Sequence, residues 1–283
     1  MADHDRSIDG EPTEGVELAL PDGRRLVVRT ENQALQGALG EIVAEEAQEE
    51  AAAARREGRD LGGWTGGSIW ESGEILARLL LACGELVRGK RVIELGTGCG
   101  LLGLTAGALG AAESLLTDNV TFMARANLEE NFRGADRSRI RVARLRWGDA
   151  ADIASVRPPF DLIMGSDIIY HRDSQIQLAD TIEALSAPGT VVLWATPDGS
   201  GSDEPAPEAG GRKSLGVGFF ERMRSLGFEL SDVTEEPAVQ EAIRVVEESR
   251  PSKSLYETDP IYGGFYSRGQ IRVTRMVKPA AKL

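Results

Sequence analysis

The stretch that decides the fold of this chain is residues 91–110, RVIELGTGCGLLGLTAGALG. An apolar run, RVIEL, passes into closely spaced glycines, and an apolar helical pattern follows at once. Glycine permits positive φ and a close approach of the backbone, and the first amides of a helix point toward whatever lies in front of it. The stretch therefore predicts a strand, a tight turn and a helix N-terminus that together hold a nucleoside cofactor.

Two acids accompany this turn. Glu94 comes just before the glycines, and Asp118 ends a second apolar run, SLLTD, where it is placed to accept hydrogen bonds from ribose hydroxyls. Gly98, Gly100 and Gly103 also satisfy G-x-G-x-x-G, so a nicotinamide or flavin enzyme fits the spacing, as does a turn that glycines close without any ligand. Glu94 favours S-adenosylmethionine, because its carboxylate suits a cationic cofactor and would repel a pyrophosphate.

A second informative segment is residues 160–170, FDLIMGSDIIY. Its apolar run follows the breaker Arg157-Pro158-Pro159 and is typical of a strand buried on both faces of a parallel sheet. Asp167 and Tyr170 then emerge at the carboxyl end of that strand, the edge where open α/β sheets bind ligands. There they would orient and desolvate an amine beside a methyl donor. The alternative is structural: Asp167 caps a helix that begins near residue 171, and Tyr170 is a half-buried packing residue.

Several motifs resemble the seven-β-strand class I methyltransferases, in particular the protein-lysine methyltransferases related to the calmodulin-lysine and elongation-factor-lysine enzymes. The D-x-x-Y element is the part most specific to this branch, whereas the glycine loop is common to all class I methyltransferases. The matching elements span about residues 62–228. They are GSIWESG (67–73), ELGTGCGL (94–101), Thr117-Asp118, Asn127 with Asn131, LRWG (145–148) and GSDIIY (165–170).

The resemblance implies a role for each matching side chain. It implies a cofactor site made of Trp70 beside the cofactor, a loop of Glu94, Gly96, Gly98 and Gly100, Asp118 on the ribose and Trp147 against the adenine. We count the neighbouring Thr97, Asn119 and Ser166 with these cofactor-binding residues. It further implies that Asp167 and Tyr170 are the catalytic residues, lining the entry of the acceptor side chain.

The pattern of apolar runs predicts an α/β fold: a Rossmann-like, seven-stranded, doubly wound sheet with one antiparallel strand. With 283 residues, 41% of them hydrophobic, the chain is long enough for one such domain with extensions. We expect an acidic disordered tail (1–15), an N-terminal hairpin and helix extension (16–60) and a class I methyltransferase domain (61–280). The expected strands lie near 91–95, 114–118, 140–146, 161–166, 190–195, 228–233 and 270–277.

The extensions carry their own signals. Residues 16–30 alternate around Pro21-Asp22-Gly23, which predicts a β-hairpin, and residues 33–58 have helical spacing. This helix looks like an insertion relative to the family's usual short connection. We further expect a hinge or lid with Trp64 at 61–67, a mobile polar loop at 197–211, a helix at 219–227 and an aromatic cluster at 256–266, which either lines the acceptor side or packs a long insertion.

Composition narrows the function class. The net charge of −13 argues against nucleic acid as the main substrate, and the arginines of residues 133–146 are expected to line a solvated strand edge. Two cysteines and two histidines make a metal site, a disulfide framework or Ser-His-Asp catalysis a poor fit. No apolar run is long enough for a membrane span, and the polar acidic N-terminus does not resemble a signal peptide. We therefore expect a monomer in the cytoplasm, with the nucleus as an alternative.

The expected activity is methyl transfer from S-adenosylmethionine to a nitrogen of a protein side chain, lysine in the first instance. Three alternatives stay open at this stage. A small-molecule methyltransferase would share every cofactor residue, a non-catalytic protein would keep the fold and bind the cofactor without turnover, and a nicotinamide oxidoreductase would share the glycine loop.

Overall fold

The computed structural model describes residues 15–36, 40–56, 65–169, 174–197, 217–249 and 271–280. Several sequence predictions lie outside these residues. They are the acidic tail, most of the hinge with Trp64, Tyr170, the polar loop after residue 197 and the aromatic cluster at 256–266.

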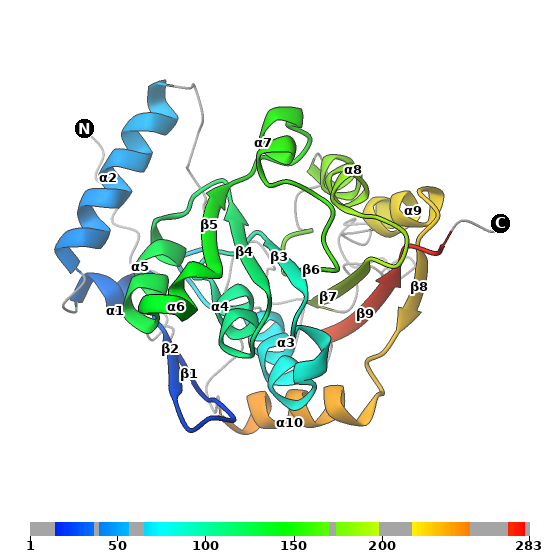
Figure 1. Ribbon diagram of the computed structural model, residues 1–283, viewed down its shortest axis with the longest axis horizontal. Coiled ribbons are helices and arrows are strands. Elements are labelled where there is room, and N and C mark those ends of the chain that lie inside the picture. The colour runs from blue at the N-terminus through cyan, green and yellow to red at the C-terminus, as the bar shows by residue number, and fades with distance from the viewer. Residues whose placement is uncertain are drawn as a thin grey trace, which may run out of the picture.

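A seven-stranded sheet forms the centre of the molecule, in the order β5-β4-β3-β6-β7-β9-β8 (Figure 1). Strands β5, β4, β3, β6 and β7 run parallel to one another, and β9 is antiparallel to both β7 and β8. The predicted doubly wound sheet with one antiparallel strand is therefore confirmed. The strands are β3 (Arg91–Leu95), β4 (Glu113–Asp118), β5 (Ile140–Arg144), β6 (Leu162–Ser166), β7 (Val191–Pro197), β8 (Glu229–Asp232) and β9 (Ile271–Val277).

Helices cover both faces of the sheet, because the central strands are apolar on both sides and each face needs a covering layer. One face packs against α3 (Glu71–Ala82), α4 (Leu101–Ala108), α5 (Phe122–Asn131) and α10 (Pro237–Ser249). The other packs against α7 (Ala150–Ser155), α8 (Gln175–Leu185) and α9 (Val217–Ser225). The remaining short elements are a 3-10 turn (Gly84–Leu86) and α6 (Gly134–Ser138).

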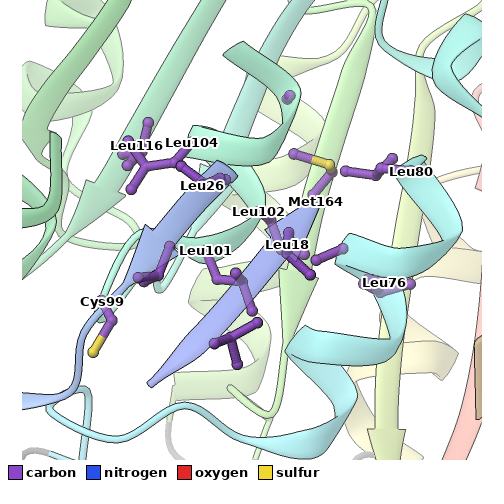
Figure 2. Close-up of a cluster of buried hydrophobic side chains, with 14 of the residues drawn as sticks. Leu18, Leu26, Leu76, Leu80, Cys99, Leu101, Leu102, Leu104, Leu116 and Met164 are labelled. Carbon is purple, nitrogen blue, oxygen red and sulfur yellow. The ribbon is translucent and has the colours of Figure 1, made fainter. Parts of the chain in front are cut away.

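The predicted hairpin is present as β1 (Val16–Ala19) and β2 (Arg25–Val28), which pair with each other in a separate two-stranded sheet. Its alternating apolar side chains point into the main core. Leu18 and Leu26 are each 1% exposed and lie among the leucines of α3 and α4 (Figure 2). The hairpin is thus part of the same hydrophobic core as the sheet.

Two asparagines fasten the hairpin to α5. Asn131 accepts a hydrogen bond from Val27 N (2.8 Å) and donates one to Val27 O (2.7 Å). Asn127 does the same with Arg29, accepting from its N (2.9 Å) and donating to its O (3.0 Å). Four residues of a helix rise ~6 Å and two residues of a strand span ~6.6 Å, so the two amides match Val27 on β2 and Arg29 directly after it. Each asparagine side chain thus makes the pair of backbone hydrogen bonds that a neighbouring strand would make.

Two element boundaries differ from the sequence prediction. The single helix expected at 33–58 is divided into α1 (Glu31–Gln36) and α2 (Gly40–Arg56). The strand expected at 140–146 ends at Arg144, because its ladder partner β4 ends opposite it at Asp118. Two residues after the strand ends, the backbone N of Arg146 donates a hydrogen bond to the carboxylate of Asp152.

The arginine-rich segment at 133–146 comprises helix α6, the outer strand β5 and the residues that flank them. Its charges pair with acids nearby: Arg137 with Glu129, Arg139 with Asp136, and Arg141 with Glu113. This agrees with the predicted solvated edge. Among the described residues, no helix is both long and apolar enough to cross a membrane, and no His, Cys, Asp and Glu cluster could hold a metal ion.

The buried position of the hairpin leads to a stability prediction. Leu26→Ala should lower the free energy of unfolding by about 2–5 kcal/mol, because it removes apolar contacts and leaves a cavity. Arg25→Ala on the same strand is the control, since its ion pair with Glu17 is exposed, and it should change the value by less than about 0.5 kcal/mol. Urea denaturation measures both. Equally small effects would mean that the hairpin does not contribute to the core.

Candidate functional site

The candidate site lies at the carboxyl ends of β3, β4 and β6. Strand β3 is paired with β4 on one side and β6 on the other, so that Leu95 lies opposite both Thr117 and Gly165. The chain order changes direction across the sheet between β3 and β6, the position where doubly wound sheets bind ligands.

The loop glycines are required by their protein neighbours. Gly96 has φ 64°, and a Cβ there would lie 2.5 Å from Ile168 Cγ2. Gly98 has φ 50°, and a Cβ there would lie 2.8 Å from Gly66 O. Two other segments therefore approach the loop closely, one of them directly after Asp167. The sequence left two reasons open for these glycines, a bound ligand or a tight turn, and the structure adds close packing against Ile168 and Gly66.

Glu94 is buried beneath the loop at the end of β3. Its carboxylate accepts hydrogen bonds from Thr97 Oγ1 (2.5 Å), Gly103 N (2.8 Å) and Leu102 N (3.3 Å). Burial raises the pKa of Glu94 to about 7, and these hydrogen bonds oppose the rise. The two amides belong to the first turn of α4, so the acid satisfies donors that a helix N-terminus otherwise leaves open.

Asp118 stands at the end of β4, next to the same loop. Its carboxylate accepts hydrogen bonds from Gly98 N (2.9 Å) and Val120 N (3.1 Å). Burial raises the pKa of Asp118 to about 6, against the effect of those amides. The contact with Gly98 ties the turn after β4 to the glycine loop, as expected if both hold one ligand.

Asp167 follows β6 with φ 56°, a left-handed conformation that few residues other than glycine adopt without strain. It is 5% exposed, and its Oδ1 accepts a hydrogen bond from the buried hydroxyl of Ser72 (3.0 Å) at the start of α3. Its backbone N also donates to Ala195 O on β7 (3.2 Å). The residue is therefore held from two sides at the carboxyl edge of the sheet, its carboxylate by α3 and its backbone by β7.

The other predicted residues take varied places around this edge. Trp70 is half-buried just before α3, with its indole N donating to Thr65 O (3.4 Å). Trp147 is half-buried and packs against the core on the opposite face, in the turn after β5. Ser166 ends β6, and its hydroxyl lies close to Gly73. Asn119, half-buried, follows Asp118, whereas Tyr170 lies outside the described residues.

Cys99 lies within the loop but is not placed as a nucleophile. Its thiol is buried and donates to Gly66 O (3.3 Å), and burial raises its pKa well above the ordinary value. A protonated, buried thiol is chemically inert.

Comparison with known proteins identifies the family. Residues 55–204, just over half of the chain, match the lysine methyltransferase family. The chain belongs to this family. It is 37% identical over 129 residues to the protein N-lysine methyltransferase METTL21A of Danio rerio, a match that covers 44% of this chain and 57% of that protein. It is 34% identical over 120 residues to a calmodulin-lysine N-methyltransferase of Arabidopsis thaliana, covering 41% and 39%.

The chain thus spans about half the length of the curated relatives it matches. A solved TehB-like SAM-dependent methyltransferase from Corynebacterium glutamicum aligns with 83% of this chain and 97% of its own, with 14% identity and a TM-score of 0.44. That likeness is too loose to assign any function.

Three contacts of this lysine methyltransferase family member had no predicted role. Ser72 was part of a quoted motif, yet its bond to Asp167 joins residues far apart in sequence. Asn127 also donates to Cys99 O (2.9 Å), which links the glycine loop to α5. Glu50 on α2 accepts from Thr121 N (2.9 Å), next to Asp118. For one of these contacts the sequence held a usable signal: Asn127 and Asn131 are spaced one helical turn apart, which places both on the same side of α5.

The buried Glu94 leads to a pH prediction for the protein without cofactor. Its pKa lies near 4.5 when unfolded and at about 7 when folded, so between these values the folded state holds a proton that the unfolded state has lost. The free energy of unfolding should therefore fall as pH rises from about 4.5 to 7, with a contribution from Glu94 of at most about 3 kcal/mol.

Urea denaturation at the two ends of this range tests the prediction. Glu94→Gln should reduce the fall, whereas Glu85→Gln, at an exposed position, should leave it as in the parent protein. A fall of the same size in Glu94→Gln would show that other groups cause it.

Proposed function

We propose that this protein transfers a methyl group from S-adenosylmethionine to a nitrogen of a protein side chain, with lysine as the acceptor. The observation that carries the proposal is the contact between Gly96 and Ile168, because it joins the glycine loop to the segment of Asp167. The loop and the turn at Asp118 would hold the donor, and Asp167 would meet the acceptor at the same sheet edge. Family membership and the names of the relatives support the same reaction.

The residues present fit a cationic cofactor. The carboxylate of Glu94 already occupies the amides of Leu102 and Gly103, which a pyrophosphate would use in a dinucleotide-binding fold. The sequence from Leu95 to Ala124 contains no lysine or arginine to balance phosphate charge. Two acids, Glu94 and Asp118, instead favour a positive group. This argues against the nicotinamide alternative, which shares the glycine spacing and the ribose acid but needs those amides for its pyrophosphate.

Specific residues would hold the cofactor and shape its surroundings. Asp118 would accept hydrogen bonds from the ribose hydroxyls, Trp70 would pack beside the cofactor and Trp147 would lie near the adenine. The bound cofactor supplies an electrophilic methyl group on a sulfonium. The loop keeps its geometry through Glu94 and Gly98, so that the donor position is fixed before the acceptor arrives.

The acceptor side requires orientation and desolvation of an amine. A lysine ammonium has no lone pair, so the nitrogen must lose its proton to water before it attacks, and burial lowers its pKa. Asp167, held by Ser72, would accept a hydrogen bond from that nitrogen and direct it toward the methyl group. We propose Tyr170 as the second group at this entrance, through its ring face or its hydroxyl.

Incubation of the purified protein with S-adenosylmethionine labelled in its methyl group, together with an extract of cells lacking the enzyme, tests the proposal. We expect label in a protein band and, after mapping, on lysine. Label in the metabolite fraction would favour a small-molecule methyltransferase instead. Binding of S-adenosylhomocysteine without transfer to either fraction would indicate a non-catalytic protein.

The ribose contact gives a binding prediction. Asp118→Ala should weaken binding of S-adenosylhomocysteine by about 1.5–3 kcal/mol, because it removes a charge-assisted hydrogen bond. Asp161→Ala is the control: this carboxylate bonds to Arg91 N at the opposite edge of the sheet, so affinity should stay unchanged. Isothermal titration calorimetry measures both. Unchanged affinity in Asp118→Ala would show that the ribose is held elsewhere.

The acceptor contact gives a prediction on transfer. Asp167→Asn should lower single-turnover methyl transfer on the order of a hundredfold and leave cofactor affinity nearly unchanged, because Asn tolerates positive φ but lacks the charge. Ser72→Ala should lower transfer less, since it loosens the carboxylate without removing it. Full transfer by Asp167→Asn, with folding and binding intact, would assign Asp167 a purely structural role.

A further inference from the structure

Helix α2 lies against α5 on the side of the molecule that carries the turn after β4 (Figure 1). Val43 is 0% exposed, and it packs together with Ala47 in the main hydrophobic core, so the first half of the helix is anchored to the rest of the molecule. It lies almost entirely before residues 55–204, the part of the chain that matches the family. The family match therefore assigns no role to α2.

The contact between α2 and the turn is specific. Glu50 Oε2 accepts a hydrogen bond from Thr121 N (2.9 Å), the amide directly before α5. Thr121 is 5% exposed, and its own side chain does not cap that helix. A carboxylate from another helix thus bonds the amide of the N-cap residue, a contact that Ala124 at the third helical position is unable to make, and it interacts with the N-terminal end of the helix dipole.

This contact completes the support of the turn at residues 118–121. Asp118 accepts from Val120 N inside the turn and from Gly98 N in the glycine loop. Glu50 holds the far end of the turn from outside. The negative charge of Glu50 also contributes to the raised pKa of Asp118, which agrees with the closeness of the two carboxylates.

We propose that α2 is a positioning element of the cofactor site and that Glu50 is its positioning residue, acting through Thr121 to set the orientation of Asp118. The inference rests on the proposed function, in that Asp118 is taken to bind the ribose. Loss of the hydrogen bond would let the turn move and weaken the grip on the cofactor. The position of Asp167 and of the acceptor would stay unchanged, so the rate of the chemical step at saturating cofactor would stay unchanged as well.

Three variants of Glu50 separate the hydrogen bond from the charge. Glu50→Ala removes both, and Glu50→Asp keeps the charge but shortens the side chain by one methylene. Glu50→Gln removes the charge but keeps an acceptor oxygen at the same reach. Glu49→Ala is the matched control, because Glu49 is the adjacent, exposed acid of the same helix.

The measurements use the full chain: calorimetric affinity for S-adenosylhomocysteine, KM for S-adenosylmethionine, kcat and the melting midpoint. We expect a roughly tenfold rise in Kd and KM for Glu50→Ala and Glu50→Asp, with kcat within about twofold of the parent. Glu50→Gln and Glu49→Ala should both bind within about twofold of the parent. If Glu50 had a purely structural role, its substitution would lower the melting midpoint, and KM would not rise while kcat stays unchanged.

Three results would overturn the inference. The first is an unchanged Kd in both Glu50→Ala and Glu50→Asp. The second is an affinity of Glu50→Gln as weak as that of Glu50→Ala, which would make the charge and not the hydrogen bond responsible. The third is a parent protein that does not bind S-adenosylhomocysteine at all, which would also end the proposed function. A parent that binds but transfers no methyl group would contradict only the proposed function, because the comparison of Kd values stands without turnover.

Discussion

The buried carboxylate of Glu94 is the group on which the candidate site depends. It stands at the end of the central strand β3 and bonds to the loop at Thr97 and to the first turn of α4. Without this acceptor, the amides of Leu102 and Gly103 would be buried and would lack a hydrogen bond, at a cost of about 1–3 kcal/mol each. The same bonds fix where the loop leaves the strand, and with it the distance between Gly96 and Ile168. The form of the turn, the start of the helix and the approach of the segment after Asp167 thus share one cause.

Helix α5 connects the parts of the molecule that surround this turn. Asn127 bonds to the hairpin and to the glycine loop, Asn131 bonds to the hairpin, and Thr121 at the helix start bonds to α2. These are side chain to backbone hydrogen bonds, which carry direction and fix register in a way that apolar contacts do not. The N-terminal extension is therefore oriented relative to the glycine loop by polar contacts and held there by the apolar core.

The sequence was sufficient for the sheet, because apolar runs, breakers and helical spacing are local signals that survive in the final fold. It was also sufficient for the alternating hairpin and for the placing of Asp118 and Asp167 at strand ends. It did not predict that Ser72 holds Asp167 or that Glu50 reaches Thr121, since contacts between residues far apart in sequence leave no periodic trace. The real partners of Glu94 were missed for a different reason. The sequence analysis assigned its carboxylate to a cationic ligand, whereas the nearby amides of Leu102 and Gly103, at the N-terminus of α4, donate hydrogen bonds to it.

The asparagine contacts also bear on the order in which the protein folds. Val27 and its partner Asn131 are 104 positions apart, and Arg29 and Asn127 are 98 apart. The hairpin leaves the ribosome before α5 does. Its hydrogen bonds to Asn127 and Asn131 can form only after about a hundred further residues have been made. Closing a loop of that length has an entropic cost that local helices avoid, and non-local contacts of this kind slow folding. During synthesis the apolar side of the hairpin is therefore without its final cover until α5 has been made and has folded against it.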